Sequence, residues 1–264
     1  MTGPSSPAVH LDYSDGVATL TLDDAPRRNA MSMALGDALY ARVDALRHAA
    51  DLRAVVLTGA GGAFSGGGDL SMLAGLRKAR FNDARAHMLA FYSRYLAVAS
   101  LPVPVIAAVR GAAIGAGLCV AIACDITLVD ADAKLAVNFA QLGLAPGMGV
   151  TLLLERRVGA QRAAELLYTG RRFDGREAAA MGLALSAHAA DAVLSEAQAL
   201  ARSIASNGPL AVRALKARLG VDHAALVRAL DAEATAQAHS YASDDLGEGL
   251  AAAMERRPAR FTGR

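Results

Sequence analysis

Two glycine-rich segments, each placed between a short apolar run and a helical pattern, constrain this chain more than any other feature. The first, residues 59–70 (GAGGAFSGGGDL), follows the apolar run 54–58, and the second, residues 110–117 (RGAAIGAG), follows the apolar run 105–109. Short apolar runs bounded by glycine are typical of strands that are buried on both faces. A chain that passes twice from such a strand through glycine into a helix is expected to form an α/β fold.

The patterns around these segments extend the prediction. Alternating apolar and polar residues on both sides of Ser14-Asp15-Gly16 predict a β-hairpin over about 9–22. Ser32 is a suitable N-cap for a helix through about Ala49. A strand is expected at 126–129, and the periodicity from about Val150 to the end is helical. Strands and helices therefore alternate in the first half, and the last third is expected to be helical.

Composition excludes several classes of protein. The chain has 264 residues, 54% of them hydrophobic, which suffices for one large domain. Its net charge of +2 predicts neither a nucleic-acid partner nor a membrane surface. The longest uncharged run, 111–124, is too short to span a bilayer. The N-terminus lacks the basic start and apolar core of a signal peptide. Cys119 and Cys124 would face different sides of one helix, so neither a disulfide nor a metal site is predicted, and we expect a cytoplasmic protein.

The two glycine segments also indicate chemistry. The first N–H groups of a helix have no internal acceptor, and glycine lets another molecule approach the backbone closely. Two such donors that converge on one oxygen would stabilise an enolate or a tetrahedral oxyanion. Two alternatives are a pair of ordinary turns and a phosphate cradle. Neither segment has the Gly-Lys-Ser/Thr ending of a P-loop, and the second lacks the third glycine and the acidic residue of a dinucleotide fingerprint.

Several motifs in order resemble one known family. Residues 59–70 and 110–126 are similar to the two oxyanion segments of the crotonase (enoyl-CoA hydratase/isomerase) superfamily. PRRNAMS resembles its early CoA-contacting segment, residues 142–184 its long stretch after the active-site loop, and EGLAAAMERRPARF its C-terminal helix. The resemblance spans about Val9 to Phe261, which is nearly the whole chain.

The resemblance implies a fold, an assembly and a ligand. It implies an α/β spiral of ββα units over 1–200 and a C-terminal helical trimerisation region over 201–264. The implied assembly is a homotrimer or a dimer of trimers. The implied ligand is an acyl-CoA thioester, with coenzyme A as part of the substrate and no tightly bound cofactor.

The resemblance also assigns roles to residues of this chain. The backbone N–H groups of Gly68 and Ala116 would hold the acyl carbonyl. Asp69, directly after the first donor, is more suited to fixing the loop through backbone hydrogen bonds than to proton transfer. The expected CoA contacts are Arg28, Ala30, Ala63, Ser65, Gly66, Asp69, Leu70 and Phe261.

The chain departs from the family pattern at the positions where the hydratases carry their catalytic carboxylic acids. The two glutamates of the family's hydratases correspond to Cys119 and Phe139, and an acid that some isomerases carry corresponds to Gly147. Loss of a general acid or base typically costs ~10²–10⁴-fold in rate, so efficient two-glutamate hydration is not expected. His239 resembles a histidine of some family decarboxylases. The expected function is a lyase or isomerase that stabilises a thioester enolate. The alternatives are a decarboxylase, a hydrolase or a weakly catalytic acyl-CoA-binding paralogue.

Overall fold

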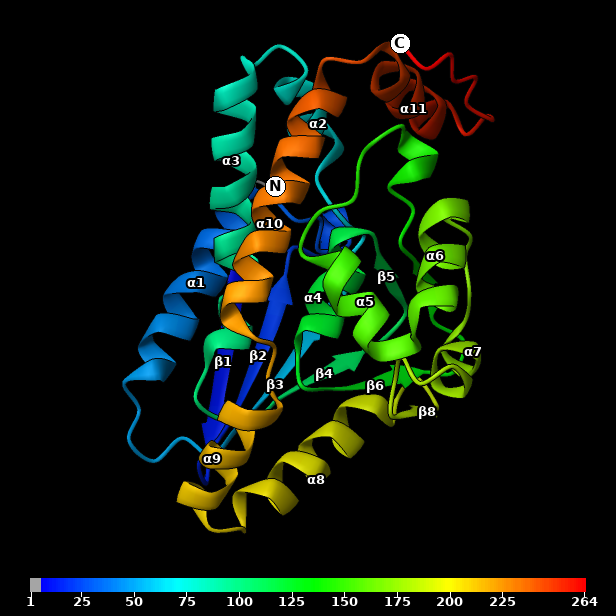
Figure 1. Cartoon of the computed structure of the whole chain (residues 1–264). Coiled ribbons are helices and arrows are strands. Elements are labelled where there is room, and N and C mark those ends of the chain that lie inside the picture. The colour runs from blue at the N-terminus through cyan, green and yellow to red at the C-terminus, as the bar shows by residue number, and fades with distance from the viewer. Residues whose placement is uncertain (1–5) are drawn as a thin grey trace, which may run out of the picture.

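The computed structural model describes residues 6–264 and shows a mixed α/β architecture (Figure 1). A six-stranded sheet has the order β1-β2-β3-β4-β6-β8, and β5 pairs with β7 in a small second sheet. Only the β1–β2 pair is antiparallel within the larger sheet. The strands are β1 (Ala8–Ser14), β2 (Val17–Asp23), β3 (Ala54–Gly59), β4 (Val105–Val109), β5 (Ala112–Ile114), β6 (Ile126–Asp130), β7 (Lys134–Ala136) and β8 (Ser186–His188).

Helices cover both faces of the larger sheet and one end of the molecule (Figure 1). The α-helices are α1 (Met33–Arg47), α2 (Leu70–Leu76), α3 (Phe81–Tyr95), α4 (Ala116–Ala123), α5 (Val150–Val158), α6 (Ala160–Thr169), α7 (Gly175–Ala180), α8 (Val193–Ala205), α9 (Pro209–Leu219), α10 (His223–Tyr241) and α11 (Asp244–Glu255). Short 3₁₀ helices are η1 (Ala25–Arg27), η2 (Leu96–Ser100) and η3 (Ala140–Leu142).

The predicted hairpin and first helix are confirmed. Asp15 and Gly16 connect β1 to β2 with φ values of +52° and +77°, which is the left-handed backbone that a two-residue hairpin turn requires. Ser32 caps α1, because its side chain accepts a hydrogen bond from the Leu35 N–H. These elements are confirmed because their signals are local in the sequence.

The parallel strands are buried on both faces, which explains why they contain apolar runs. On one face, Val56 and Ile106 pack with Val193 and Ala197 of α8. On the other face, neighbouring residues such as Leu57 join the main core beneath α1, α3 and α4. Successive side chains of a strand point to opposite faces, so no position in β3 or β4 could be polar without a buried partner.

One part of the sequence prediction is wrong. The stretch after Val150 is not helical throughout, because β8 pairs with β6 and forms an edge of the sheet. Residues 256–264 are also not helical. A strand of three residues is too short to produce a detectable alternation, and it forms because β6 offers unpaired backbone groups.

The C-terminal helices α9 and α10 contact the rest of the fold. Figure 1 shows α10 running beside α3, and the two helices pack against each other. Lys216 of α9 forms an ion pair with Asp125, whose carboxylate also accepts the Val105 N–H. The division at about residue 200 and the trimerisation role of 201–264 stay predictions. In the part of the chain that is described, no helix has both the length and the apolarity to cross a membrane.

Candidate active site

The two glycine-rich segments lie side by side, as an oxyanion site requires. Ser65 of the first segment pairs with Ala113 of β5, and its N–H donates to the Ala112 carbonyl at 2.9 Å. The start of α4 then packs directly on this segment. A Cβ at Gly117 would lie 2.7 Å from the Ser65 Cβ, so only glycine allows the helix to approach this closely.

The expected donors, Gly68 and Ala116, line the same cavity. Ala116 is the first residue of α4, where a backbone N–H has no partner within the helix. Within residues 6–264, neither the Gly68 nor the Ala116 N–H donates a hydrogen bond to another group. Both donors are therefore available to a bound oxygen.

Asn29 holds the first glycine segment in shape. Its side chain is fully buried and donates to the carbonyls of Ala60 at 3.0 Å and Ala63 at 2.8 Å. Its amide oxygen accepts the Asp24 N–H at 2.7 Å. Asn29 has a φ of +53°, a conformation that asparagine tolerates better than most residues. The sequence patterns do not reveal this role, because the carbonyls of Ala60 and Ala63 lie more than thirty residues along the chain from Asn29.

Asp69 ends the first segment as the N-cap of α2. Its carboxylate accepts the N–H groups of Ser71 at 2.8 Å and Met72 at 3.2 Å. Burial raises the pKa of Asp69, but the hydrogen bonds from Ser71 and Met72 outweigh burial and leave that pKa below its ordinary value. The ionised Asp69 carboxylate is hydrogen-bonded to backbone N–H groups, and it therefore fixes the loop just after Gly68, the first expected donor.

The cavity has a volume of about 210 Å³ and carries almost no charge. Apolar side chains from α2, α3 and the loop before α5 form most of its wall, and the polar side chains are those of Tyr92, Asn138 and Gln237. Among the described residues, no Asp, Glu, His, Lys, Arg or Cys lines it. Burial raises the pKa of Tyr92 far above its ordinary value, so the phenol keeps its proton.

Cys119 and Phe139, the residues that the resemblance assigned to the two glutamate positions, differ in their exposure to this cavity. Phe139 lines the cavity, whereas Cys119 is fully buried and does not line it. Burial raises the pKa of the Cys119 thiol well above its ordinary value, and the nearby Glu233 carboxylate adds to this effect. A neutral thiol inside the core and a phenyl ring supply no proton-transfer group.

A buried polar pair occupies the space beside Gly147. The Tyr92 hydroxyl donates to the Gln237 Oε1 at 2.8 Å, and the Gln237 Nε2 donates to the Ala145 carbonyl at 2.9 Å. A Cβ at Gly147 would lie 2.6 Å from the Tyr92 oxygen and 2.7 Å from the Gln237 Nε2. Residue 147, where the resemblance predicted the acid of some isomerases, therefore has no room for a side chain. No local pattern could have revealed this pair, whose members are 145 residues apart.

Glu233 is buried close to this pair but does not line the cavity. Its carboxylate accepts the Gly149 N–H at 2.6 Å and both the N–H and the hydroxyl of Thr151, at 2.9 and 2.6 Å. Burial raises the pKa of Glu233, and these hydrogen bonds oppose that increase. Glu233 therefore caps the first turn of α5. The N-cap residue Gly149 has no side chain that could accept these hydrogen bonds.

The structure places His239 away from the cavity. Its side chain is exposed, and its ring lies 4.7 Å from the ring of Phe81 on the surface between α10 and α3. His239 is not among the residues that line the cavity. In the part of the chain that the structure describes, no cluster of three or more His, Cys, Asp or Glu residues could hold a metal ion.

The expected CoA contacts are brought only partly together. Gly66 and Leu70 line the cavity, and the Gly66 N–H donates to the Arg28 carbonyl at 2.7 Å. Ser65 and Ala63 are buried within the first segment. Phe261 is half-exposed beyond the end of α11 and does not line the cavity. Ala30 is half-buried between Asn29 and Met31.

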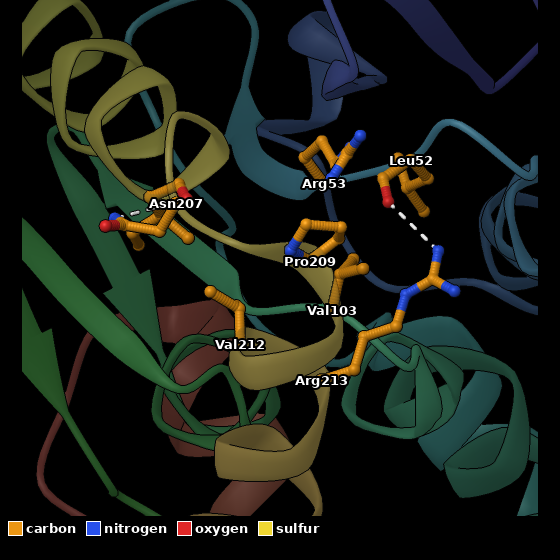
Figure 2. A pocket seen from close by; sticks show the side chains of 8 residues that line it. Leu52, Arg53, Val103, Asn207, Pro209, Val212 and Arg213 are labelled. Atoms are coloured by element: carbon orange, nitrogen blue, oxygen red, sulfur yellow. Dashed lines mark hydrogen bonds between the residues drawn. The ribbon is translucent and has the colours of Figure 1, made fainter.

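A second hollow, near the start of α9, is far smaller. Figure 2 shows Pro209 next to Val103 in this hollow, with Arg213 donating to the Leu52 carbonyl at 3.3 Å. Its volume of about 10 Å³ is enough for about one water molecule. This hollow is therefore too small for an organic ligand. A wider and more open hollow of about 600 Å³ lies at the C-terminal end, between α11 and residues 257–262, and contains neither glycine-rich segment.

Comparisons with known proteins show which family the chain is similar to. A family model described as enoyl-CoA hydratase/isomerase matches residues 12–264. The human mitochondrial methylglutaconyl-CoA hydratase is 34% identical over 268 residues, which cover 96% of this chain and 76% of that protein. Pseudomonas aeruginosa OdaA is similar in structure, with a TM-score of 0.82, 31% identity and coverage of 94% and 99%. A Pseudoalteromonas atlantica enoyl-CoA hydratase/isomerase has a TM-score of 0.84 at 27% identity, with coverage of 97% and 100%.

Proposed function

This chain belongs to the enoyl-CoA hydratase/isomerase family, and from that premise we propose that it stabilises a thioester enolate with the N–H groups of Gly68 and Ala116. The observation that supports the proposal is that Gly68 and Ala116 line one largely apolar cavity and that, within residues 6–264, neither backbone N–H donates a hydrogen bond. Backbone donors that are aimed at a developing oxyanion typically contribute about 10²–10³-fold each to the rate. In this proposal the protein is an acyl-CoA enzyme whose main catalytic groups are two backbone N–H groups.

The reaction that follows enolate formation is the second part of the proposal. We take the lyase or isomerase activity of the family as the first candidate. Among the described residues, the lack of a carboxylate, imidazole or thiol on the cavity wall favours a second candidate, a decarboxylase or hydrolase. Loss of CO₂ from a β-carboxyl thioester itself leaves the enolate electrons behind, so no protein base is needed to generate it. Hydrolysis would instead use the two donors to hold a tetrahedral oxyanion.

The experiment is a panel of CoA thioesters incubated with the protein and followed by mass spectrometry. The panel contains enoyl-, dienoyl- and malonyl-type thioesters together with a saturated acyl-CoA. A mass gain of one water indicates hydration, a loss of CO₂ indicates decarboxylation, and release of free CoA indicates hydrolysis. An isomerised double bond leaves the mass unchanged and is detected by retention time.

The outcomes separate the candidates. Binding without turnover would identify a weakly catalytic acyl-CoA-binding paralogue, since the donors would remain while the acids are replaced. Efficient hydration of crotonyl-CoA would refute the inference from Cys119 and Phe139. If no thioester is bound or converted, the proposed function is wrong as a whole.

A further inference from the structure

The Tyr92–Gln237 pair is a feature of the cavity that enolate stabilisation does not use. The two side chains come from α3 and α10, are only 1% and 2% exposed, and both line the cavity. Burying polar groups in an apolar wall costs free energy unless they are hydrogen-bonded. Their remaining hydrogen-bonding capacity therefore indicates what kind of group the cavity accepts.

The hydrogen bonds of the pair determine which groups stay free. The Ala145 carbonyl can only accept, so the amide nitrogen of Gln237 must face it, at 2.9 Å. The amide oxygen then faces Tyr92, and the phenol must donate to it, at 2.8 Å. One amide N–H of Gln237 and the acceptor lone pairs of the Tyr92 oxygen remain without a partner among the described residues. The pair thus presents one donor and one acceptor next to each other.

The electrostatics of the site favour a neutral ligand group. The Tyr92 phenol is buried and protonated, and the nearby Glu233 carboxylate adds to the burial effect in raising its pKa. No Lys, Arg or His side chain of residues 6–264 lines the cavity to pair with a ligand carboxylate. A methyl group would leave the donor and the acceptor unsatisfied, whereas a hydroxyl group can satisfy both.

We propose that the Tyr92–Gln237 pair makes the cavity selective for acyl groups that carry a hydroxyl. The hydroxyl would donate to the Tyr92 oxygen and accept the free N–H of Gln237. This inference rests on the proposed acyl-CoA function and names the substrate class of the same cavity. Gly147 is a condition for it, because a larger residue at this position would displace both members of the pair.

The test is a binding comparison by isothermal titration calorimetry with the whole 264-residue chain. The ligands are hexanoyl-CoA, its analogues with one hydroxyl at C3, C4, C5 or C6, and adipoyl-CoA, which ends in a carboxylate. Two net hydrogen bonds predict that one hydroxy analogue binds at least about tenfold more tightly than hexanoyl-CoA. Adipoyl-CoA is expected to bind no more tightly than hexanoyl-CoA.

Two variants and a matched control assign the selectivity to the pair. Tyr92→Phe and Gln237→Leu each remove one of the two hydrogen-bond partners and should reduce a tenfold preference to about threefold or less. Tyr95→Phe makes the same change on the same helix, but Tyr95 does not line the cavity and its hydroxyl donates to the Ser32 carbonyl at 2.6 Å. This control should keep the preference, and thermal unfolding of all variants shows that they are folded.

The outcomes that contradict the inference are distinct from those that contradict the proposed function. If hexanoyl-CoA binds and no hydroxyl improves binding, the selectivity is wrong while the acyl-CoA function stands. If Tyr92→Phe and Tyr95→Phe lose the preference for a hydroxyl-bearing acyl group equally, the Tyr92–Gln237 pair has only a packing role. If no thioester binds, with or without a hydroxyl, the proposed function itself fails.

Discussion

Replacing Ala116 by proline removes one of the two proposed oxyanion donors where proline disturbs the backbone least. Ala116 is the first residue of α4, a position that proline favours because its missing N–H would have no helical partner. The preceding Gly115 has φ +51° and ψ −119°, and this ψ is far from the α-helical value that a following proline disfavours. The substitution is therefore expected to change the free energy of unfolding by less than about 1 kcal/mol.

The catalytic effect should be much larger than the effect on stability. Removal of one oxyanion donor typically costs about 2.7–4 kcal/mol of transition-state stabilisation, which is about 10²–10³-fold in rate. Here the Ala116 N–H makes no hydrogen bond within residues 6–264, so the lost interaction is with the ligand and not with the fold. The ring also occupies part of the space that the carbonyl oxygen would use, which adds to the loss.

The assay works whatever the natural substrate is. Acetoacetyl-CoA forms an enolate that absorbs in the near ultraviolet, so its bound enolate fraction reports on the oxyanion site directly. Ala116→Gly keeps the N–H and is the matched control. The same variants are then compared in kcat/KM with any thioester that the panel shows to be converted.

Two outcomes would contradict the assignment of this donor. If Ala116→Pro keeps its enolate signal and its turnover within about threefold of the parent, the N–H of residue 116 is not an oxyanion donor. If Ala116→Gly loses as much activity as the proline variant, the effect belongs to packing at the start of α4. Circular dichroism and thermal unfolding verify that both variants are folded.

Three further predictions concern the framework of the site. Asn29→Ala removes four side-chain hydrogen bonds, three of them buried, and leaves alanine at φ +53°, so it should cost roughly 4 kcal/mol of unfolding free energy in urea titrations, whereas exposed Asn207→Ala should cost less than about 1 kcal/mol. Burial raises the pKa of Cys119 well above its ordinary value and that of Cys124 to about 12, so a disulfide reagent at pH 8 should label neither thiol until urea unfolds the protein. Labelling of either thiol in the folded protein would contradict this prediction. The raised pKa values stabilise the native state below the thiol pKa of the unfolded chain, and this stabilisation is lost as pH rises through the native pKa values. Asp69→Ala removes the cap of α2 and should cost about 1 kcal/mol at neutral pH. Because the native pKa of Asp69 is lowered, its contribution to the free energy of unfolding is present above its ordinary pKa and is lost as pH falls. The unfolding free energies of parent and variant should therefore converge in acid. A difference that stays constant with pH would show that the charge of Asp69 does not stabilise the fold.

The sequence alone determined the features whose causes lie within a few residues. Ser32 at the start of α1 and Asp15-Gly16 in the hairpin are set by local hydrogen bonds and local φ values, so they could be predicted without a structure. The order of apolar strand, glycine-rich segment and helix indicated where two unpaired backbone donors would occur. The replacement of both hydratase glutamates, by Cys119 and Phe139, stays a prediction from the motif positions of the sequence.

Only the tertiary structure decided what surrounds those donors. No sequence pattern indicates that the Asn29 side chain reaches the carbonyls of the first glycine-rich segment, or that Tyr92 meets Gln237 beside Gly147. The motifs also left His239 as a candidate, which the fold places on the surface beside Phe81. Periodicity fixes which face of an element is apolar, but not which distant element packs on it. The chemistry of this cavity is decided by such distant contacts, and they leave it with the polar side chains of Tyr92, Asn138 and Gln237 and without a charged side chain among the residues described.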